Sequence, residues 1–177
     1  MHRLVALLFA TLLVVACYSQ AKRPDGGEGL LPVGSKAPAL VAIDAVGSPT
    51  TLEQLRGHPV LVYFYPGDET PGCTKEACAL RDAYKKYEAA GVKIIGVSSN
   101  SADSHKAFIA NHALPFPLAA DEDGAIGKAY GVRKAIFGYE RVSFLVGADG
   151  SIQKVWPDVD PVLHATEVLA FAAPDAR

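Results

Sequence analysis

Segment 65–78 combines two cysteines with a proline and a threonine at spacings that suit thiol chemistry: Pro66, Thr70, Cys73 and Cys78. The segment leaves an apolar run and enters a predicted helix, so Cys73 falls in the first helical turn. The free N–H groups and the dipole of a helix N-terminus favour an anion at that place. Because a thiol attacks as its thiolate, this position predicts a reactive Cys73.

Three further residues are predicted to complete the site around this thiol. Thr70 can offer its hydroxyl as a hydrogen-bond donor, and Pro66, which carries no N–H, can wall the pocket against water. An arginine brought from elsewhere in the chain would stabilise the thiolate. Our candidate is Arg141, which opens an apolar strand, and Arg133 is the weaker candidate.

The second cysteine, Cys78, lies five residues after Cys73. On an intact helix this spacing gives about 500° of rotation and roughly 7.5 Å of rise. A disulfide needs Cα atoms within about 7 Å, so we expect that a Cys73–Cys78 bond requires roughly residues 70–80 to unwind. The alternative is that both cysteines are structural, since free cysteine is often buried as a small hydrophobe. That alternative suits Cys78 better than Cys73.

The N-terminus is predicted to be an export signal. A basic start precedes a nearly unbroken apolar run over 4–15, which is shorter than the roughly 20 residues that span a membrane. The run ends at Ala16-Cys17, and this junction resembles the lipobox of bacterial lipoproteins, in which the cysteine is acylated. We therefore expect a lipoprotein-type signal peptide over 1–16 and a lipid anchor on Cys17. The protein would then be exported and membrane-anchored in the bacterial cell envelope, facing the periplasm. The alternative is an ordinary secretory signal with an incidental Cys17.

Composition places one folded domain after a tether. Residues 17–32 are polar and glycine-rich, which predicts a flexible tether, and residues 33–177 are predicted to form the domain. The chain has 177 residues, half of them hydrophobic, which is enough for one domain with a core. A formal charge of -2 predicts no broad attraction to nucleic acid. The five histidines and three cysteines show no four-ligand zinc spacing.

Apolar runs and helical patterns alternate along the domain. Linked by helices, the strands imply parallel pairing, and a terminal hairpin adds antiparallel pairing. We therefore predict an α/β, thioredoxin-like fold with a mixed central sheet flanked by helices. Reactive groups in such sheets tend to lie beyond the carboxyl ends of strands, which is where Cys73 falls. The predicted strands cover 39–46, 59–65, 92–98, 117–120, 141–146 and 151–156, and the predicted helices cover 72–90, 102–112, 125–130 and a last one opened by Asp160-Pro161.

Other polar clusters carry weaker signals. His105 and His112 lie seven residues apart on one helix, which we interpret as a solvated face rather than a metal site. His58 and His164 belong to no motif, and the acidic run 121–124 lacks the spaced ligands of a calcium loop.

Tyr-Pro-x3-Thr-Pro-Gly-Cys-Thr-x-Glu-Ala-Cys, at 65–78, resembles the active-site signature of peroxiredoxins. The cysteine spacing is similar to that of the peroxiredoxin Q subfamily, also called bacterioferritin comigratory protein, and the resemblance extends from about Val33 to the C-terminus. The resemblance implies a thiol peroxidase acting on hydrogen peroxide and organic hydroperoxides. It also implies no metal or organic cofactor, a thioredoxin-like reductant, and a monomer.

The resemblance further implies a role for each site residue. Cys73 would be the peroxidatic cysteine that becomes a sulfenic acid, and Cys78 would resolve it as an intramolecular disulfide. Thr70 would orient the thiolate and the peroxide, and Pro66 would shield them. Arg141 would stabilise the thiolate and the developing charge.

Two other functions fit a tethered thioredoxin-like domain. A copper metallochaperone would hold a soft metal on its cysteines, but such proteins usually pair Cys-x3-Cys with a distant histidine. A thiol–disulfide oxidoreductase would be expected to carry Cys-x-x-Cys, whereas this chain has Cys-x4-Cys.

Overall fold

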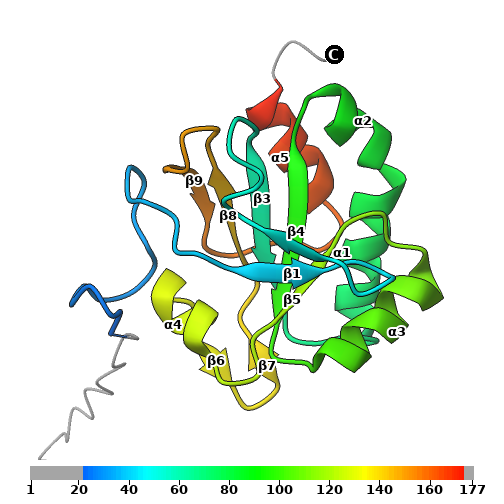
Figure 1. The fold of residues 1–177 in the computed structure, drawn as a ribbon, viewed down its shortest axis with the longest axis horizontal. Coiled ribbons are helices and arrows are strands. Elements are labelled where there is room, and N and C mark those ends of the chain that lie inside the picture. Colours follow the sequence, from blue (N-terminus) through cyan, green and yellow to red (C-terminus); the bar gives the residue numbers. More distant parts are fainter. Residues whose placement is uncertain (1–21, 174–177) are drawn as a thin grey trace, which may run out of the picture.

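The computed structural model describes residues 22–173, so the predicted signal peptide and Cys17 lie outside the described residues. A seven-stranded sheet with the order β2-β1-β5-β4-β3-β8-β9 forms the centre of the fold (Figure 1). The strands are β1 (Val41–Ile43), β2 (Pro49–Thr51), β3 (Val60–Phe64), β4 (Lys93–Ser98), β5 (Leu118–Ala120), β6 (Lys134–Ala135), β7 (Gly138–Tyr139), β8 (Val142–Val146) and β9 (Ile152–Trp156). The helices are α1 (Pro71–Asp82), α2 (Tyr84–Ala89), α3 (Ala102–His112), α4 (Ala125–Tyr130) and α5 (His164–Ala172).

The sheet is mixed, as the sequence predicts. β3 pairs in parallel with β4 and antiparallel with β8, and β4 pairs in parallel with β5. β9 returns antiparallel to β8, while β1 and β2 extend the other edge. The short β6 and β7 form a separate two-stranded hairpin. The predicted thioredoxin-like α/β fold is therefore confirmed.

Side chains of β3 divide the core into two halves because successive residues of a strand point to opposite faces. Val62 and Phe64 pack on the face that is covered by Tyr130 of α4. Leu61 and Tyr63 pack on the opposite face, against α1, α3 and α5. All five residues of β3 are buried, which explains why this strand lacks the polar alternation of a half-exposed strand.

The turn from β3 into α1 places Cys73 at the edge of the second half of the core. Thr70 is the N-cap residue and Pro71 begins the helix, where a missing N–H leaves no helical hydrogen bond unmade. Cys73, Ala77 and Leu80 then form the buried stripe of α1. This stripe agrees with the predicted face of the helix.

The predicted single helix over 72–90 is divided in the structure. Ala83, with ψ near zero, separates α1 from α2. After this break Tyr87 is fully buried, and its hydroxyl donates to the Ala165 carbonyl of α5 at 2.9 Å. Residue periodicity alone does not reveal such a break, because Tyr84 and Tyr87 continue the same helical spacing.

The stretch 22–32 differs from the flexible tether predicted over 17–32. Arg23 is buried, and its guanidinium donates to the carbonyls of Glu28 and Gly29 at 3.0 and 2.8 Å. Leu31 belongs to the core and its N–H donates to the Tyr130 carbonyl. Composition did not reveal the order of this segment. One arginine donates to several carbonyls of a glycine-rich turn, and one leucine packs the segment against the core. Residues 17–21 lie outside the described residues.

The C-terminal helix begins later than predicted. Asp160 accepts hydrogen bonds from the N–H groups of Val162 and Leu163, yet α5 itself starts at His164. The capping chemistry is present, but it closes a turn before the helix. Within residues 22–173, no helix combines the length and the apolar character needed to cross a membrane.

Candidate active site

Cys73 lies at the third helical position of α1 with only 1% of its surface exposed. The Arg141 guanidinium donates to its Sγ at 3.1 Å. This contact follows from strand register: Phe64 pairs with Val142, so the residue before β8 lies beside the end of β3, where the chain turns toward α1. The predicted partner is therefore Arg141, while Arg133 pairs with Glu140 on the surface.

A buried carboxylate holds this arginine in place. Arg141 Nη1 donates to Glu76 Oε2 at 2.5 Å, and only 1% of the Glu76 side chain is exposed. The same guanidinium thus bridges Glu76 and Cys73, which lie on neighbouring turns of α1. Gly72 allows this approach, since a Cβ there would lie 2.7 Å from Arg141 Nη2. Glu76 belongs to the motif quoted above, but sequence reasoning gave it no role.

His164 joins this cluster from the first position of α5. Its Nδ1 lies 2.8 Å from Glu76 Oε1, and its side chain is fully buried. The relative orientation of the two groups is not that of a hydrogen bond, and both atoms lack a hydrogen-bond partner, so we treat this as a close electrostatic contact. Burial, together with the charges of Glu76 and Cys73, raises the pKa of the neighbouring Tyr63 well above its usual value. Sequence reasoning dismissed His164 because nothing in the local pattern indicates this long-range contact.

Thr70 and Pro66 lie at the same helix entrance. The Thr70 hydroxyl donates to the Gly67 carbonyl at 3.1 Å, and it makes no capping hydrogen bond. This hydroxyl therefore closes the loop, whereas the sequence predicted that it would serve the Cys73 thiol. Pro66 is half-buried beneath β7, where a Cβ on Gly138 would lie 1.8 Å from the Pro66 carbonyl oxygen. The β6–β7 hairpin therefore covers this loop. The φ of Gly138, +109°, also favours glycine at this position.

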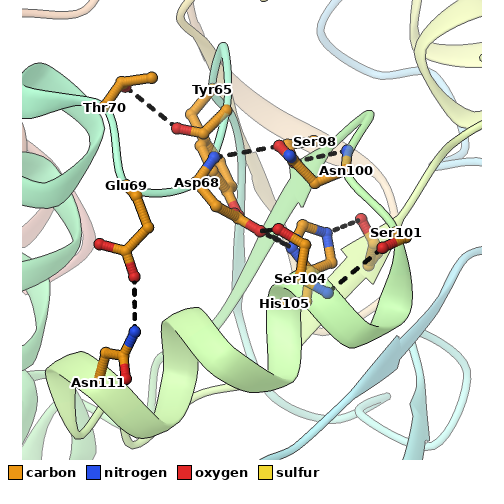
Figure 2. A network of polar contacts seen from close by, with 12 residues as sticks. Tyr65, Asp68, Glu69, Thr70, Ser98, Asn100, Ser101, Ser104, His105 and Asn111 are labelled. Atoms are coloured by element: carbon orange, nitrogen blue, oxygen red, sulfur yellow. Dashed lines mark hydrogen bonds and ion pairs between the residues drawn. The ribbon is translucent and has the colours of Figure 1, made fainter.

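Figure 2 shows how Asp68 ties the same loop to α3. Its carboxylate accepts hydrogen bonds from Ser104 Oγ at 2.6 Å and from Tyr65 Oη at 2.7 Å, and lies 2.9 Å from His105 Nδ1. Burial alone would raise the pKa of Asp68, but the hydrogen bonds from His105, Ser104 and Tyr65 outweigh it and lower that pKa. The loop before Cys73 is therefore held by a buried polar network.

The two helix histidines are not a solvated face, which corrects the sequence interpretation. His105 is fully buried, and its second nitrogen lies 3.2 Å from the Ala119 carbonyl. His112 is half-buried, with Nε2 2.8 Å from Glu69 Oε2 and Nδ1 4.0 Å from Cys78 Sγ. Both histidines contact residues of segment 65–78 that are far away in sequence, so helical spacing could not reveal these contacts.

Both cysteines of α1 are free, and the helix between them is intact. Cys73 is buried and Cys78 is half-buried. The arrangement therefore provides one thiol beside a cation in a dry environment and a second thiol near solvent. Among residues 22–173, no cluster of three or more His, Cys, Asp or Glu side chains could hold a metal ion.

Comparison with known proteins agrees with this geometry. The model of the AhpC/TSA family matches residues 33–155. The chloroplastic peroxiredoxin Q of Sedum lineare is 42% identical over 139 residues, covering 77% of this chain and 75% of that protein.

Solved structures extend the likeness to three dimensions. Peroxiredoxin Q of Xanthomonas campestris is 35% identical with a TM-score of 0.71, covering 78% of this chain and 92% of that one. A variant of PrxQ from Xylella fastidiosa is 28% identical with a TM-score of 0.76, covering 85% and 100%. Another similar structure, 34% identical with a TM-score of 0.71 and covering 78% and 92%, concerns the alkyl peroxide reduction activity of the Xanthomonas campestris bacterioferritin comigratory protein. The chain therefore belongs to the AhpC/TSA family and is a thiol peroxidase of its peroxiredoxin Q, or bacterioferritin comigratory protein, subfamily.

Proposed function

We propose that Cys73 is the peroxidatic cysteine and that Arg141 is its electrostatic partner. The observation that carries this proposal is the 3.1 Å contact between Arg141 Nη2 and Cys73 Sγ, with the guanidinium anchored on buried Glu76. The thiolate attacks one peroxide oxygen, the O–O bond breaks, and the other oxygen leaves as an alcohol or water after taking a proton. Cys73 becomes a sulfenic acid. Arg141 stabilises the thiolate and the charge that develops on the oxygens.

The substrates proposed are hydrogen peroxide and organic hydroperoxides. The reported alkyl peroxide reduction by the Xanthomonas campestris relative supports the second class. The copper and oxidoreductase alternatives have less support. The contact of Cys73 with a guanidinium disfavours metal capture, and the cysteine spacing departs from Cys-x-x-Cys.

Cys78 is the proposed resolving cysteine. Its thiolate attacks the Cys73 sulfenic sulfur, a disulfide forms, and the hydroxyl leaves as water after taking a proton. On the intact α1 the two residues are five positions apart, too far for this bond. Resolution therefore needs the first turns of α1 to open. A thioredoxin-like dithiol then reduces the disulfide, and the protein works as a monomer.

Peroxide consumption with a thioredoxin system tests these roles. Cys73→Ser should abolish turnover, while Cys78→Ser should complete one turnover and accumulate a sulfenic acid that dimedone traps on Cys73. Cys17→Ser is the matched control, because it removes a cysteine outside the domain. Undiminished turnover in Cys73→Ser would falsify the peroxidatic assignment.

An envelope location is proposed on the N-terminal sequence alone. The signal-like residues 1–16 and the cysteine at 17 support export and acylation, with the domain facing the periplasm. Mass spectrometry of the mature N-terminus tests this, with a diacylglyceryl-modified Cys17 expected. An unmodified Cys17, or an uncleaved chain, would remove the anchor and leave the peroxidase assignment in place.

A further inference from the structure

Cys78 lies beside a histidine and a glutamate that the steps above do not use. The Cys78 Sγ is 4.0 Å from Nδ1 of His112, and Nε2 of the same ring is 2.8 Å from Glu69 Oε2. The three side chains come from α1, from the end of α3 and from the loop before α1. The imidazole therefore lies between a thiol and a carboxylate.

The carboxylate fixes which ring nitrogen carries the proton. An ionised carboxylate can only accept hydrogen bonds, so the neutral imidazole donates from Nε2 to Glu69 and leaves Nδ1 free to accept. Hydrogen bonds from His112 and Asn111 lower the pKa of Glu69, which keeps this carboxylate ionised. The acceptor nitrogen of His112 is thus the one that faces Cys78.

Several contacts hold the imidazole in this place. The Arg81 guanidinium donates to the His112 carbonyl at 2.8 Å, which ties α1 to the end of α3. The Phe108 ring packs edge-on against His112 with 4.9 Å between centroids. Asn111 Nδ2 donates to Glu69 Oε1 at 3.0 Å. Figure 2 draws this hydrogen bond.

The backbone on both sides of the pair is strained. Within residues 22–173, the non-glycine residues with positive φ are Glu69, at 58°, and Ala113, at 49°. Such conformations persist where surrounding contacts determine them, and they concentrate at functional sites. One belongs to the carboxylate of the pair and the other directly follows His112.

We propose that His112 is the proton acceptor that prepares Cys78 for resolution, and that Glu69 is the positioning residue that orients His112. This inference rests on the proposed resolving role of Cys78. While α1 is folded, Nδ1 takes the proton of the Cys78 thiol. After the helix opens, the thiolate attacks the Cys73 sulfenic sulfur, the S–S bond forms and the S–O bond breaks. The hydroxyl leaves as water after taking a proton from solvent, and His112 returns the proton that it accepted to solvent.

The charged groups around the pair define its pH response. Arg81 of α1 stands beside Cys78, and its own pKa is raised, first by Asp82 and also by the Cys78 charge. Asp68 lies on the same loop as Glu69 and affects it electrostatically. Arg81 favours the Cys78 thiolate, so its charge must stay unchanged in the variants used as tests.

The alkylation of Cys78 tests the pair without any peroxide. In full-length Cys73→Ser protein, iodoacetamide would be applied between about pH 6 and pH 9. Peptide mass spectrometry then measures the adduct on the peptide that contains Cys78. His112→Ala should move the Cys78 profile upward by about one pH unit, and Glu69→Gln should move it in the same direction by less. His58→Ala, at an exposed histidine, is the matched control and should leave the profile unchanged.

Two outcomes decide the proposal. If His112→Ala and His58→Ala give the same alkylation profile, His112 is not the proton acceptor. Should His112→Ala fail to give a native circular dichroism spectrum, His112→Gln replaces it, since glutamine keeps the bulk but cannot take a proton, and the same upward shift is expected.

A single-turnover experiment measures the reaction step itself. With Cys73 present, one equivalent of hydrogen peroxide should oxidise Cys73 equally fast in native and His112→Ala protein, whereas disulfide formation should slow by about tenfold in the variant. Unchanged disulfide formation would overturn the proposal. If Cys73 is not oxidised in the native protein either, the proposed function is overturned. The alkylation result, which needs no peroxide, would still stand.

Discussion

The first turn and the middle of one short helix give two thiols opposite environments. Cys73, at the N-terminal end of α1, is 1% exposed and contacts a guanidinium at 3.1 Å. Cys78, one and a half turns later, is half-buried and lies 4.0 Å from an imidazole. The first environment stabilises an anion permanently, because arginine remains charged at all accessible pH values. The second depends on a neutral imidazole nitrogen that can accept a proton.

The partners of the two thiols also come from different parts of the fold. Arg141, directly before β8, contacts Cys73, and His164 of α5 contacts Glu76, which anchors Arg141. His112 of α3 lies near Cys78 and contacts Glu69 of the loop before α1. The contacts around Cys73 are buried, and breaking them removes the partner of a buried charge. The contacts around Cys78 are partly exposed and can be released at lower cost. This difference suits the proposed cycle, in which the helix is folded for attack and open for resolution.

The largest expected effect is the complete loss of hydrogen-exchange protection in the segment that carries both thiols. Oxidation to the disulfide should remove hydrogen-exchange protection from roughly residues 70–80, because the intact helix cannot bring the two sulfurs together. β3 and β4 should stay protected in both states and serve as the internal reference. Exchange measured by mass spectrometry on reduced and oxidised protein checks this, and equal protection of α1 in both states would refute the coupling.

Arg141→Met should lower the peroxide kcat/KM by about 10²–10³, the usual cost of losing one preorganised donor. The variant also leaves buried Glu76 without its cation, which costs about 3–5 kcal/mol of the free energy of unfolding. Stopped-flow peroxide kinetics and urea unfolding measure the two effects. Arg133→Met, at the surface, is the matched control. A rate equal to that of the control would show that Cys73 does not need the guanidinium.

Glu76→Gln should slow peroxide reduction by about tenfold, since the neutral amide holds the Arg141 fork less firmly than the carboxylate does. Disulfide formation from the sulfenic acid should be unchanged, which separates the environment of Cys73 from that of Cys78. Glu140→Gln, a partly exposed carboxylate that pairs with Arg133, is the control. If the variant slows only disulfide formation, Glu76 does not act through the Arg141–Cys73 pair.

Asp68→Asn should lower the free energy of unfolding at pH 7 by about 1–3 kcal/mol, because hydrogen bonds to a charged acceptor are lost. The folded-state pKa of Asp68 is lowered, so its stabilisation is present above the unfolded pKa of about 3.9 and is lost as the pH falls through the folded value. Native protein and variant should therefore converge below about pH 4. Urea unfolding at several pH values measures this, and a constant difference down to low pH would contradict it.

Much of the fold, and the surroundings of Cys73, could be predicted from local sequence. The apolar run of β3, the exact span of α3 and the buried stripe of α1 follow from residue type and periodicity. Arg141 could be proposed because it opens an apolar strand, and the structure added that this strand pairs with β3. The break at Ala83 and the ordering of residues 22–32 were missed, since residue periodicity and composition report neither a local change of backbone angles nor the hydrogen bonds of a buried arginine. Thr70 was placed correctly, but its hydroxyl has the Gly67 carbonyl as its acceptor.

The sequence by itself determined that Cys73 lies in the first turn of a helix, because Pro71 and the helix start are local properties of the chain, and our proposal that Cys73 is the reactive thiol begins from that position. It also determined the spacing that prevents a Cys73–Cys78 bond on a folded helix. Only the tertiary structure decided which histidines contact the groups around the two cysteines. His164 meets Glu76, and His112 meets Cys78, across long sequence separations. The reason is physical: electrostatic and hydrogen-bond contacts act over a few ångströms in space, and residue spacing along the chain does not report that distance.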